Sequence, residues 1–318
     1  MFETVTERFG TLKLFSSAQM VNNTRYDHLF GKLDEYVEQL GFVISLFGLV
    51  FNFCSYHTAG YLKQKNSSIT FIKCLAVWDT IAVFQDGVMV LGGNYFNFNI
   101  FNFNRLACKT LYWQSWASTI TAIYHMNALV IDRSLAIGAP IWYKQKSSPK
   151  LAVKISISIT IVIYILNVGL IYGYDISDGT CKLTAQSNVI QFYLGFILIV
   201  ITSLIPLVIT SCTNMFFIYK LRSRSSKNNA ERRLTAMLVT SSVAFTISVG
   251  VIMINLLILS NVIPLNIESL TIKSFIAKLA ELFGIINSSL NFLFYLVSGP
   301  MFRNAFIQLI KDLFNANK

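Results

Sequence analysis

The chain has 318 residues, of which 54% are hydrophobic and only 13% charged, and its mean hydropathy is +0.57. A charged share about half that of a typical soluble domain leaves too little polar surface to face water, which excludes an ordinary soluble protein and favours a bilayer. The net charge of +11 would suggest nucleic acid in a soluble domain, but these cations lie in short segments between apolar runs, so we expect no nucleic-acid partner.

Seven apolar runs are long enough to cross a bilayer, which takes about 20 residues per helix. The third run is the most polar, so hydropathy alone supports it least. The sequence therefore predicts an all-α membrane protein, a seven-transmembrane helix bundle. The predicted spans are about 37–59, 69–92, 107–132, 151–173, 189–219, 234–260 and 272–297.

An eighth, shorter stretch at about 299–314 has helical periodicity but is too short and too amphipathic to span. Its apolar side carries Phe302, Phe306, Leu309, Ile310, Leu313 and Phe314. We expect it to lie on the membrane surface. The predicted organisation is an extracellular N-terminal segment at 1–36, the transmembrane domain at 37–298, and a surface helix with a short cytoplasmic tail at 299–318.

Loop cations predict the orientation, because basic loops stay on the cytoplasmic side. The loops after the first, third and fifth spans are rich in lysine and arginine, and the alternate loops are poorer. The N-terminus is therefore expected outside the cell and the C-terminus inside. The Asn22-Asn23-Thr24 sequon would then be extracellular, where Asn22 could be glycosylated.

Ionisable residues inside the spans are costly in lipid, and each is a functional candidate for that reason. Asp79 lies mid-span, and Asp86 follows seven residues later, two helical turns away on the same predicted face. In the seventh span, Lys278 and Glu281 lie three residues apart, where they could serve a site or simply pair with each other. Asn287, Ser288 and Asn291 follow on the inner half of that helix, and Asp132-Arg133 closes the third span.

The five cysteines fall into two groups according to their position in the predicted spans or loops. Three lie inside apolar runs, where free thiols are ordinary, and Cys108 and Cys181 lie at the ends of loops. No Cys-x-x-Cys pair or His/Cys ligand spacing occurs, so we expect no metal site.

These residues together resemble the rhodopsin-like, or class A, G-protein-coupled receptors over about 37–314. The resemblance rests on a series of motif positions in order along the chain. They are Gly48 and Asn52, Leu75-Ala76 with Asp79, Cys108 placed 24 residues before Asp132, Asp132-Arg133 with Pro140, Pro206, Glu231, Phe245, Asn291 with Tyr295, and Phe302. Any single match is weak, whereas the ordered set is specific.

The resemblance implies roles for these positions. Arg133 would pair with Asp132 and Glu231 at rest and be released by outward movement of the sixth helix, with Asn214 and Tyr295 in the same switch. The implied partners are an extracellular ligand and a heterotrimeric G protein in the plasma membrane. A sodium ion is the one cofactor implied, at a polar core of Asp79, Asn287, Ser288 and Asn291. Cys108 and Cys181 would form the extracellular disulfide, the alternative being two free thiols.

Several motif positions depart from the family pattern. Ser134 and Phe292 replace the usual Tyr and Pro, and Ala122 replaces a sodium-pocket Ser. The fourth span lacks its usual Trp, and the sixth has Ser248-Val249-Gly250-Val251 where Cys-Trp-x-Pro is usual. The family's aromatic toggle cannot be transferred intact to this chain.

The ligand site is predicted from the same resemblance. Ser115 stands where amine receptors place an Asp, and Ile285 stands where opsins place the retinal lysine, which argues against both ligand classes. Asp86 and Glu281 could hold a cationic group such as an arginine. With the resemblance to invertebrate neuropeptide receptors, these features suggest an amidated neuropeptide with a basic residue.

Three other classes compete with a receptor. A seven-helix transporter or channel could use the intramembrane acids Asp79, Asp86 and Glu281, but would not explain the Asp132-Arg133 pair. A light-driven retinal protein would have to use Lys278. An enzyme is not expected, because the sequence has no evident nucleophile–base or metal constellation.

Overall fold

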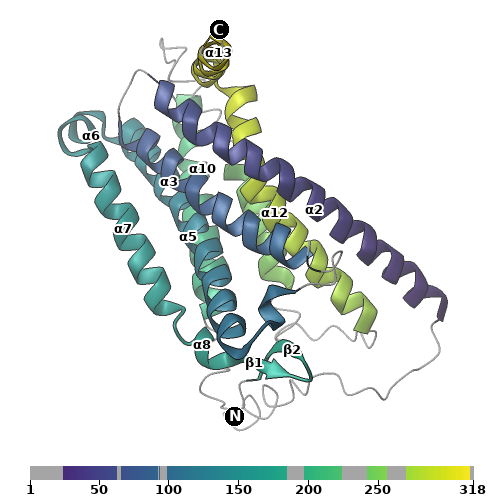
Figure 1. The fold of residues 1–318 in the computed structure, drawn as a ribbon. Helices are drawn as coiled ribbons and strands as arrows, with labels where there is room; N and C mark the ends of the chain where they lie inside the picture. The colour runs from purple at the N-terminus through teal and green to yellow at the C-terminus, as the bar shows by residue number, and fades with distance from the viewer. Residues whose placement is uncertain are drawn as a thin grey trace.

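The computed structural model describes residues 24–62, 66–91, 93, 99–184, 197–223, 242–255 and 270–315. Long helices run side by side in one bundle, with a small β-hairpin at one end and helices α6 and α13 at the other (Figure 1). Five of the described helical segments are long and apolar enough to cross a membrane. They are Leu29–Tyr61, Ser67–Met89, Pro149–Gly173, Ile199–Phe217 and Phe275–Val297.

Helix α2 (Thr24–Tyr61) contains the first span but begins well before the predicted residue 37. The polar stretch ahead of the apolar run therefore belongs to the same helix and forms its N-terminal end. Helix α3 (Ser67–Ala82) begins at an N-cap, Asn66, whose side chain accepts a hydrogen bond of 3.1 Å from the Ile69 amide. The predicted first span, 37–59, thus matches the C-terminal end of α2 and differs at its N-terminal end, whereas the predicted start of the second span at 69 is close to Ser67.

The second span changes its winding halfway. From Val83 to Leu91 the chain forms a π-helix, η1, which has more residues per turn than an α-helix. The prediction that Asp79 and Asp86 share one face is therefore wrong. Asp79 hydrogen-bonds to the seventh helix and Asp86 to the third, because the wider winding between them changes the register.

Helix α5 (Arg105–Gly138) is the predicted third span. Its 34 residues reach about 51 Å at 1.5 Å per residue, more than the hydrocarbon core of a bilayer. Asn104 caps its first turn by accepting a 2.8 Å hydrogen bond from the Ala107 amide. This helix is not among the five that meet the hydropathy criterion, as its polar composition predicts.

The fourth span is formed by α7 (Pro149–Leu166) and the short α8 (Leu170–Gly173), after the small helix α6 (Pro140–Lys146). Strands β1 (Tyr174–Ser177) and β2 (Thr180–Leu183) follow as an antiparallel hairpin, with Ile176 opposite Cys181. The all-helical prediction omitted this hairpin. Asp178 and Gly179, with φ of 52° and 74°, form its two-residue turn.

The remaining helices complete the bundle. The fifth span contains a π-helix, η3 (Ile197–Leu204), and then α10 (Ile205–Ser223). The described part of the sixth helix is Ser242–Asn255, and α12 (Leu270–Ser298) is the seventh span. Helix α13 (Pro300–Asn315) matches the predicted surface helix and buries Phe302, Ala305 and Leu309. A single 3-10 turn, η2 (Ile100–Asn102), precedes α5.

Small residues bring the first span close to its neighbours. A Cβ atom added at Gly48 would lie 2.8 Å from Ser289 Cβ on α12, and one added at Gly87 would overlap Ser45. Such close backbone approach is how helices associate in lipid, where no hydrophobic force drives them together. One turn below Gly48, the Asn52 amide donates a 2.9 Å hydrogen bond to the Ser288 carbonyl. Helices α2 and α12 therefore form one closely packed pair.

Aromatic rings fill the junction of the second, third and fourth spans. Trp78 of α3 lies 5.8 Å from the ring of Tyr164 on α7, and Trp113 of α5 contacts the same tyrosine at 5.5 Å. The Trp113 indole also donates to the Tyr164 carbonyl at 3.3 Å. Tryptophans from α3 and α5 thus supply the aromatic packing at this fourth helix, which has no tryptophan of its own.

Candidate functional site

The carboxylate of Asp86 lies between η1 and α5 at the hairpin end of the bundle. It accepts hydrogen bonds from the Ser115 hydroxyl and, at 3.0 Å, from the Thr119 hydroxyl. The neighbouring Gln85 accepts a further 2.9 Å bond from Ser118. Each carboxylate oxygen of Asp86 has one hydroxyl donor, so its orientation is fixed while lone pairs remain for a cation.

Glu281 belongs to the same acidic region, although it comes from α12. It interacts electrostatically with Asp86, with Glu38 of α2 and with Lys278. Tyr112 of α5 interacts electrostatically with both Glu281 and Asp86. Two of the three predicted ligand residues, Asp86 and Ser115, are thus in direct contact, and Glu281 of the seventh helix interacts electrostatically with Asp86.

Lys278 does not pair with Glu281, one of the two alternatives that its spacing left open. Its ammonium lies 2.8 Å from Glu38 and 3.2 Å from Asp34, both on α2. Glu38, Lys278 and Glu281 line one small cavity between α2 and α12. The pairing connects residues about 240 positions apart, which periodicity within one helix could not predict.

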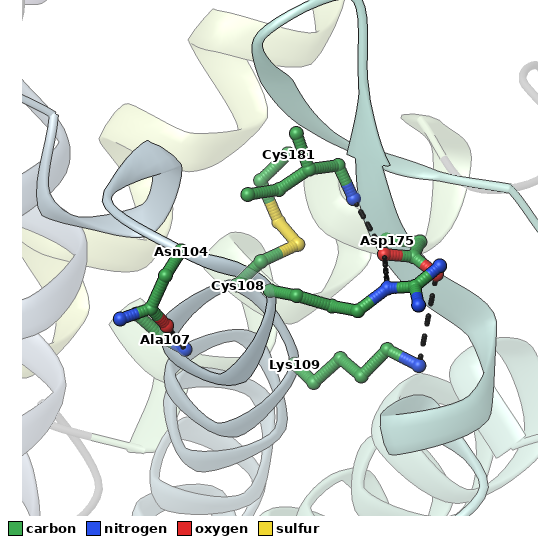
Figure 2. Close-up of polar contacts among 8 residues, drawn as sticks. Asn104, Ala107, Cys108, Lys109, Asp175 and Cys181 are labelled. Carbon is green, nitrogen blue, oxygen red and sulfur yellow. Dashed lines mark hydrogen bonds and ion pairs between the residues drawn. A yellow bond between two sulfur atoms is a disulfide. The ribbon is translucent and has the colours of Figure 1, made fainter.

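A disulfide-linked loop lies over this end of the bundle. Cys108 and Cys181 are bonded, with Cα atoms 5.5 Å apart, which confirms the predicted pairing. Figure 2 shows the disulfide beside Asp175, toward which Lys109 points. Asn102 accepts a 2.8 Å bond from the Cys181 amide, which fixes strand β2 to the loop before α5.

The charges of this loop stabilise it further. Asp175 accepts a 2.7 Å hydrogen bond from Arg105 Nε and lies 3.7 Å from Lys109 Nζ. The Arg105 hydrogen bond holds the pKa of the Asp175 carboxyl below its usual value. Tyr174 stacks on Tyr112 with ring centroids 4.2 Å apart, so the hairpin also packs onto the third helix.

The predicted polar core lies midway along the bundle. The Asn291 amide donates a 2.8 Å hydrogen bond to Asp79, and Ser288 also hydrogen-bonds to this carboxylate. Asp79, Ser288 and Asn291 are buried, and Asn287 is half-buried on the same helix. A sodium ion would find the Asp79 carboxylate, the Ser288 hydroxyl and the Asn291 amide oxygen here, whereas buried Ala122 offers no oxygen. We assign the ion no part in the mechanism.

At the opposite end, Asp132 is held by hydroxyl groups. It accepts hydrogen bonds from Ser67 at 2.6 Å, from Tyr143 of α6 at 3.0 Å, and from Ser68. Ser67 also contacts Tyr143 at 2.8 Å and Ser147 at 2.7 Å. The predicted Asp132–Arg133 ion pair is absent among these contacts, because the hydroxyl groups occupy the carboxylate.

Arg133 points to a different partner. Its guanidinium donates a weak 3.4 Å hydrogen bond to Asn66, the residue that caps α3. Its Nε is buried and has no hydrogen-bond partner within the described ranges. Glu231, the partner predicted for it, lies outside the described residues, as does the glycosylation candidate Asn22.

Asn214 and Tyr295 lie apart from these contacts. Asn214 of α10 accepts a hydrogen bond from Ser242, which joins the fifth and sixth helices. Tyr295 is 1% exposed and packs edge-on against Phe302 of α13, with centroids 5.5 Å apart. The structure therefore does not bring these two residues into contact with Arg133.

The sequence reasoning missed Ser67, Ser68, Tyr143, Asn66 and Thr119. The hydroxyl residues carry no signal on their own, because serine and threonine are common in membrane helices. A buried carboxylate needs donors, but Ser67 and Ser68 are more than 60 residues from Asp132 in sequence, so only the structure shows which hydroxyl groups supply them.

A bundle of membrane-spanning helices, with a disulfide-tethered hairpin at one end and a half-buried arginine at the other, defines a multi-pass membrane protein with a site at each end. Comparison with protein families matches residues 53–295 to the 7 transmembrane receptor (rhodopsin family). The chain belongs to this family of seven-transmembrane receptors. A search among curated proteins finds no match.

Membership of the family settles the coarse function. Rhodopsin-family proteins are G-protein-coupled signalling receptors and not enzymes, and their partners are an extracellular ligand and a G protein. The chain is accordingly a multi-pass membrane protein of a class that is typically found in the plasma membrane.

Proposed function

We propose that this receptor binds an extracellular neuropeptide with a basic residue, and that Asp86 and Glu281 hold the peptide's cation. The observation that carries the proposal is the fixed carboxylate of Asp86, which is oriented by Ser115 and Thr119 and interacts electrostatically with Glu281. Two acids in a low-dielectric site attract a cation far more strongly than they would in water. An arginine side chain suits them, because its planar guanidinium can bind carboxylates in bidentate fashion.

The orientation we propose puts the hairpin end outside the cell. The inner loops carry the excess of lysine and arginine, including Lys144 and Lys146 at the end of α6. The disulfide supports the same orientation, since such bonds persist in oxidising compartments. Antibody access to tags at the two termini in unpermeabilised cells tests it: only the N-terminal tag should be labelled.

Signalling in this proposal runs from the acidic site to Arg133. A ligand that binds the active arrangement better shifts the population toward it. Outward movement of the sixth helix would expose Arg133, and a G-protein helix would enter the opened cavity. The hydrogen bond between Asn214 and Ser242 is one described contact that this movement would have to change.

The experiment combines a charge change in the receptor with one in the peptide. Amidated peptides with one arginine, each paired with its citrulline counterpart, are screened through a promiscuous G-protein reporter. Asp86→Asn or Glu281→Gln should each lower arginine-peptide potency about thirtyfold, since a charge-assisted hydrogen bond is worth about 2 kcal/mol. Citrulline peptides should lose less on the same substitutions, because they have no cation.

Asp178→Asn is the matched control, because this hairpin-tip carboxylate is 86% exposed and its contacts among the described residues are an ion pair with Lys182 and a hydrogen bond from Ser177. It removes the same charge and should change potency less than about fivefold, which corresponds to the roughly 1 kcal/mol upper value for an exposed ion pair. Equal arginine-peptide potency in the wild type and both acid variants would contradict the proposal.

A further inference from the structure

An ion cluster joins the outer halves of the first and seventh helices. Lys278 of α12 contacts Glu38 at 2.8 Å and Asp34 at 3.2 Å, and its side chain is only 29% exposed. The two acids are 13% and 20% exposed. A half-buried cation held by two carboxylates is better fixed than an exposed ion pair, which is screened by solvent and salt.

A second acceptor for the same lysine lies close by. Glu281 is three residues further along α12, a spacing at which side chains on one helix reach each other. Glu38, Lys278 and Glu281 all line the cavity between α2 and α12. A change of side-chain rotamer could therefore move the ammonium from Glu38 to Glu281 without any change in the backbone.

The two positions of the lysine have different consequences for the ligand site. While Lys278 is bound to α2, it forms no ion pair within 4 Å with Glu281 or Asp86, and among the described residues its effect on Glu281 is a longer-range electrostatic interaction. If the ammonium moved to Glu281, it would neutralise one of the two acids and occupy the place of an incoming cation. Asp34 and Glu38 would then affect the ligand site through the position of Lys278, in addition to the direct electrostatic interaction of Glu38 with Glu281.

We propose that Asp34 and Glu38 are specificity-determining residues that hold Lys278 away from Glu281 and so keep the acidic site open to a cationic ligand. The inference rests on the proposed function, because it takes Asp86 and Glu281 as the ligand's acids. Lys278 is an internal competitor of the ligand, and the first helix controls whether it competes. Loosening of α2 from α12 would close the site by releasing the lysine.

The test measures the charge of the site directly and needs neither peptide nor G protein. In the full-length receptor with Cys54, Cys74 and Cys212 replaced by alanine, Ser115→Cys places one thiol beside Asp86. Its reaction rate is measured with a cationic (trimethylammonium-ethyl) and an anionic (sulfonatoethyl) methanethiosulfonate. The cationic-to-anionic rate ratio reports the local potential.

We expect Asp34→Asn/Glu38→Gln to lower this ratio about tenfold, the effect of moving one positive charge to within several ångströms of the thiol. Adding Lys278→Gln to that double variant should return the ratio to within threefold of the starting receptor. Each single acid variant leaves the lysine one partner and should give a smaller decrease, which keeps the test available if the double variant does not fold.

The matched control is Glu35→Gln, which removes a carboxylate from the same turn of α2. The Glu35 carboxylate accepts a hydrogen bond from Gln39 and does not pair with Lys278. Its ratio should change less than twofold. An equal fall in Glu35→Gln, or no recovery on adding Lys278→Gln, would overturn the proposal by showing a general charge effect. A thiol at 115 that reacts with neither reagent would overturn its premise of an open site. The proposed function fails separately, if no arginine peptide depends on Asp86 or Glu281.

Discussion

Close packing of the first and seventh helices at Gly48 can be tested by adding one methyl group. In Gly48→Ala the new Cβ would lie 2.8 Å from Ser289 Cβ and 3.2 Å from Ser289 Cα, and it would also overlap the serine hydroxyl. Rotation of the hydroxyl cannot relieve the contact, because the Cβ and backbone atoms are also too close. The helices must separate slightly, and the bond from Asn52 to the Ser288 carbonyl lies one turn away.

The expected destabilisation is the difference of two effects. Overpacking a well-packed contact costs about 1–3 kcal/mol, whereas alanine gains up to about 1 kcal/mol over glycine in a helix. The net loss should be about 1–2 kcal/mol, which lowers the melting temperature by roughly 1.5–3 °C in a chain of this size. Melting in detergent is followed at one heating rate for all variants, since unfolding of such proteins is commonly irreversible.

Gly250→Ala is the control, because a Cβ at this glycine in the sixth helix would meet no atom within 4 Å. It should melt at or slightly above the wild-type temperature. Ser289→Gly in the Gly48→Ala background removes both offending side-chain atoms and should restore part of the loss, with a coupling energy of about 1 kcal/mol. A Gly48→Ala receptor that melts like Gly250→Ala would refute the close contact.

Four other outcomes follow from the two ends of the bundle. Arg133→Gln should abolish ligand-stimulated nucleotide exchange at unchanged surface expression, and signalling without the cation would contradict its role. Tyr143→Phe removes one hydrogen bond to Asp132, worth about 1 kcal/mol, and should raise basal nucleotide exchange up to about fivefold by releasing a restraint on the resting state. An unchanged basal rate would show that this bond does not restrain the resting state. Cys108→Ser should cost about 2–5 kcal/mol and sharply reduce surface expression. The pKa of the Asp175 carboxyl is lowered in the folded receptor, so its ionised form stabilises the fold above the usual aspartate pKa of about 4. This stabilisation is lost only as the pH falls through the lowered pKa. The difference in melting temperature between the wild type and Asp175→Asn should therefore be constant from about pH 8 to 5.

Features that depend on one stretch of sequence were predictable. The apolar runs located the spans, the periodicity of 299–314 located α13, and the resemblance paired Cys108 with Cys181. The hairpin was predictable as well but was missed: Asp178-Gly179 between two short runs is a strong turn signal. Its omission came from treating the outer loop only as a connection between spans.

Features that depend on contacts between distant segments were not predictable from local pattern. The π-helix η1 has no reliable sequence signature, yet it decides that Asp79 faces α12 while Asp86 faces α5. The partner of Lys278 was sought three residues away and lies on the first helix. A rule based on spacing within one helix considers Glu281 alone. It cannot show that Asp34 and Glu38 of another helix bind Lys278 instead.

Carboxylate–hydroxyl bonds fasten the second and third helices to each other at both ends. Asp86 of η1 accepts from Ser115 and Thr119 at the hairpin end, and Asp132 of α5 accepts from Ser67 and Ser68 at the opposite end, near α6. Sliding one helix past the other would leave a buried carboxylate without its donors, which is costly in a low-dielectric interior. We therefore expect these two helices to move as one body during activation. The displacement that exposes Arg133 must then occur in the helices around them, and the Asn214–Ser242 contact places one boundary of that motion between α10 and the sixth helix.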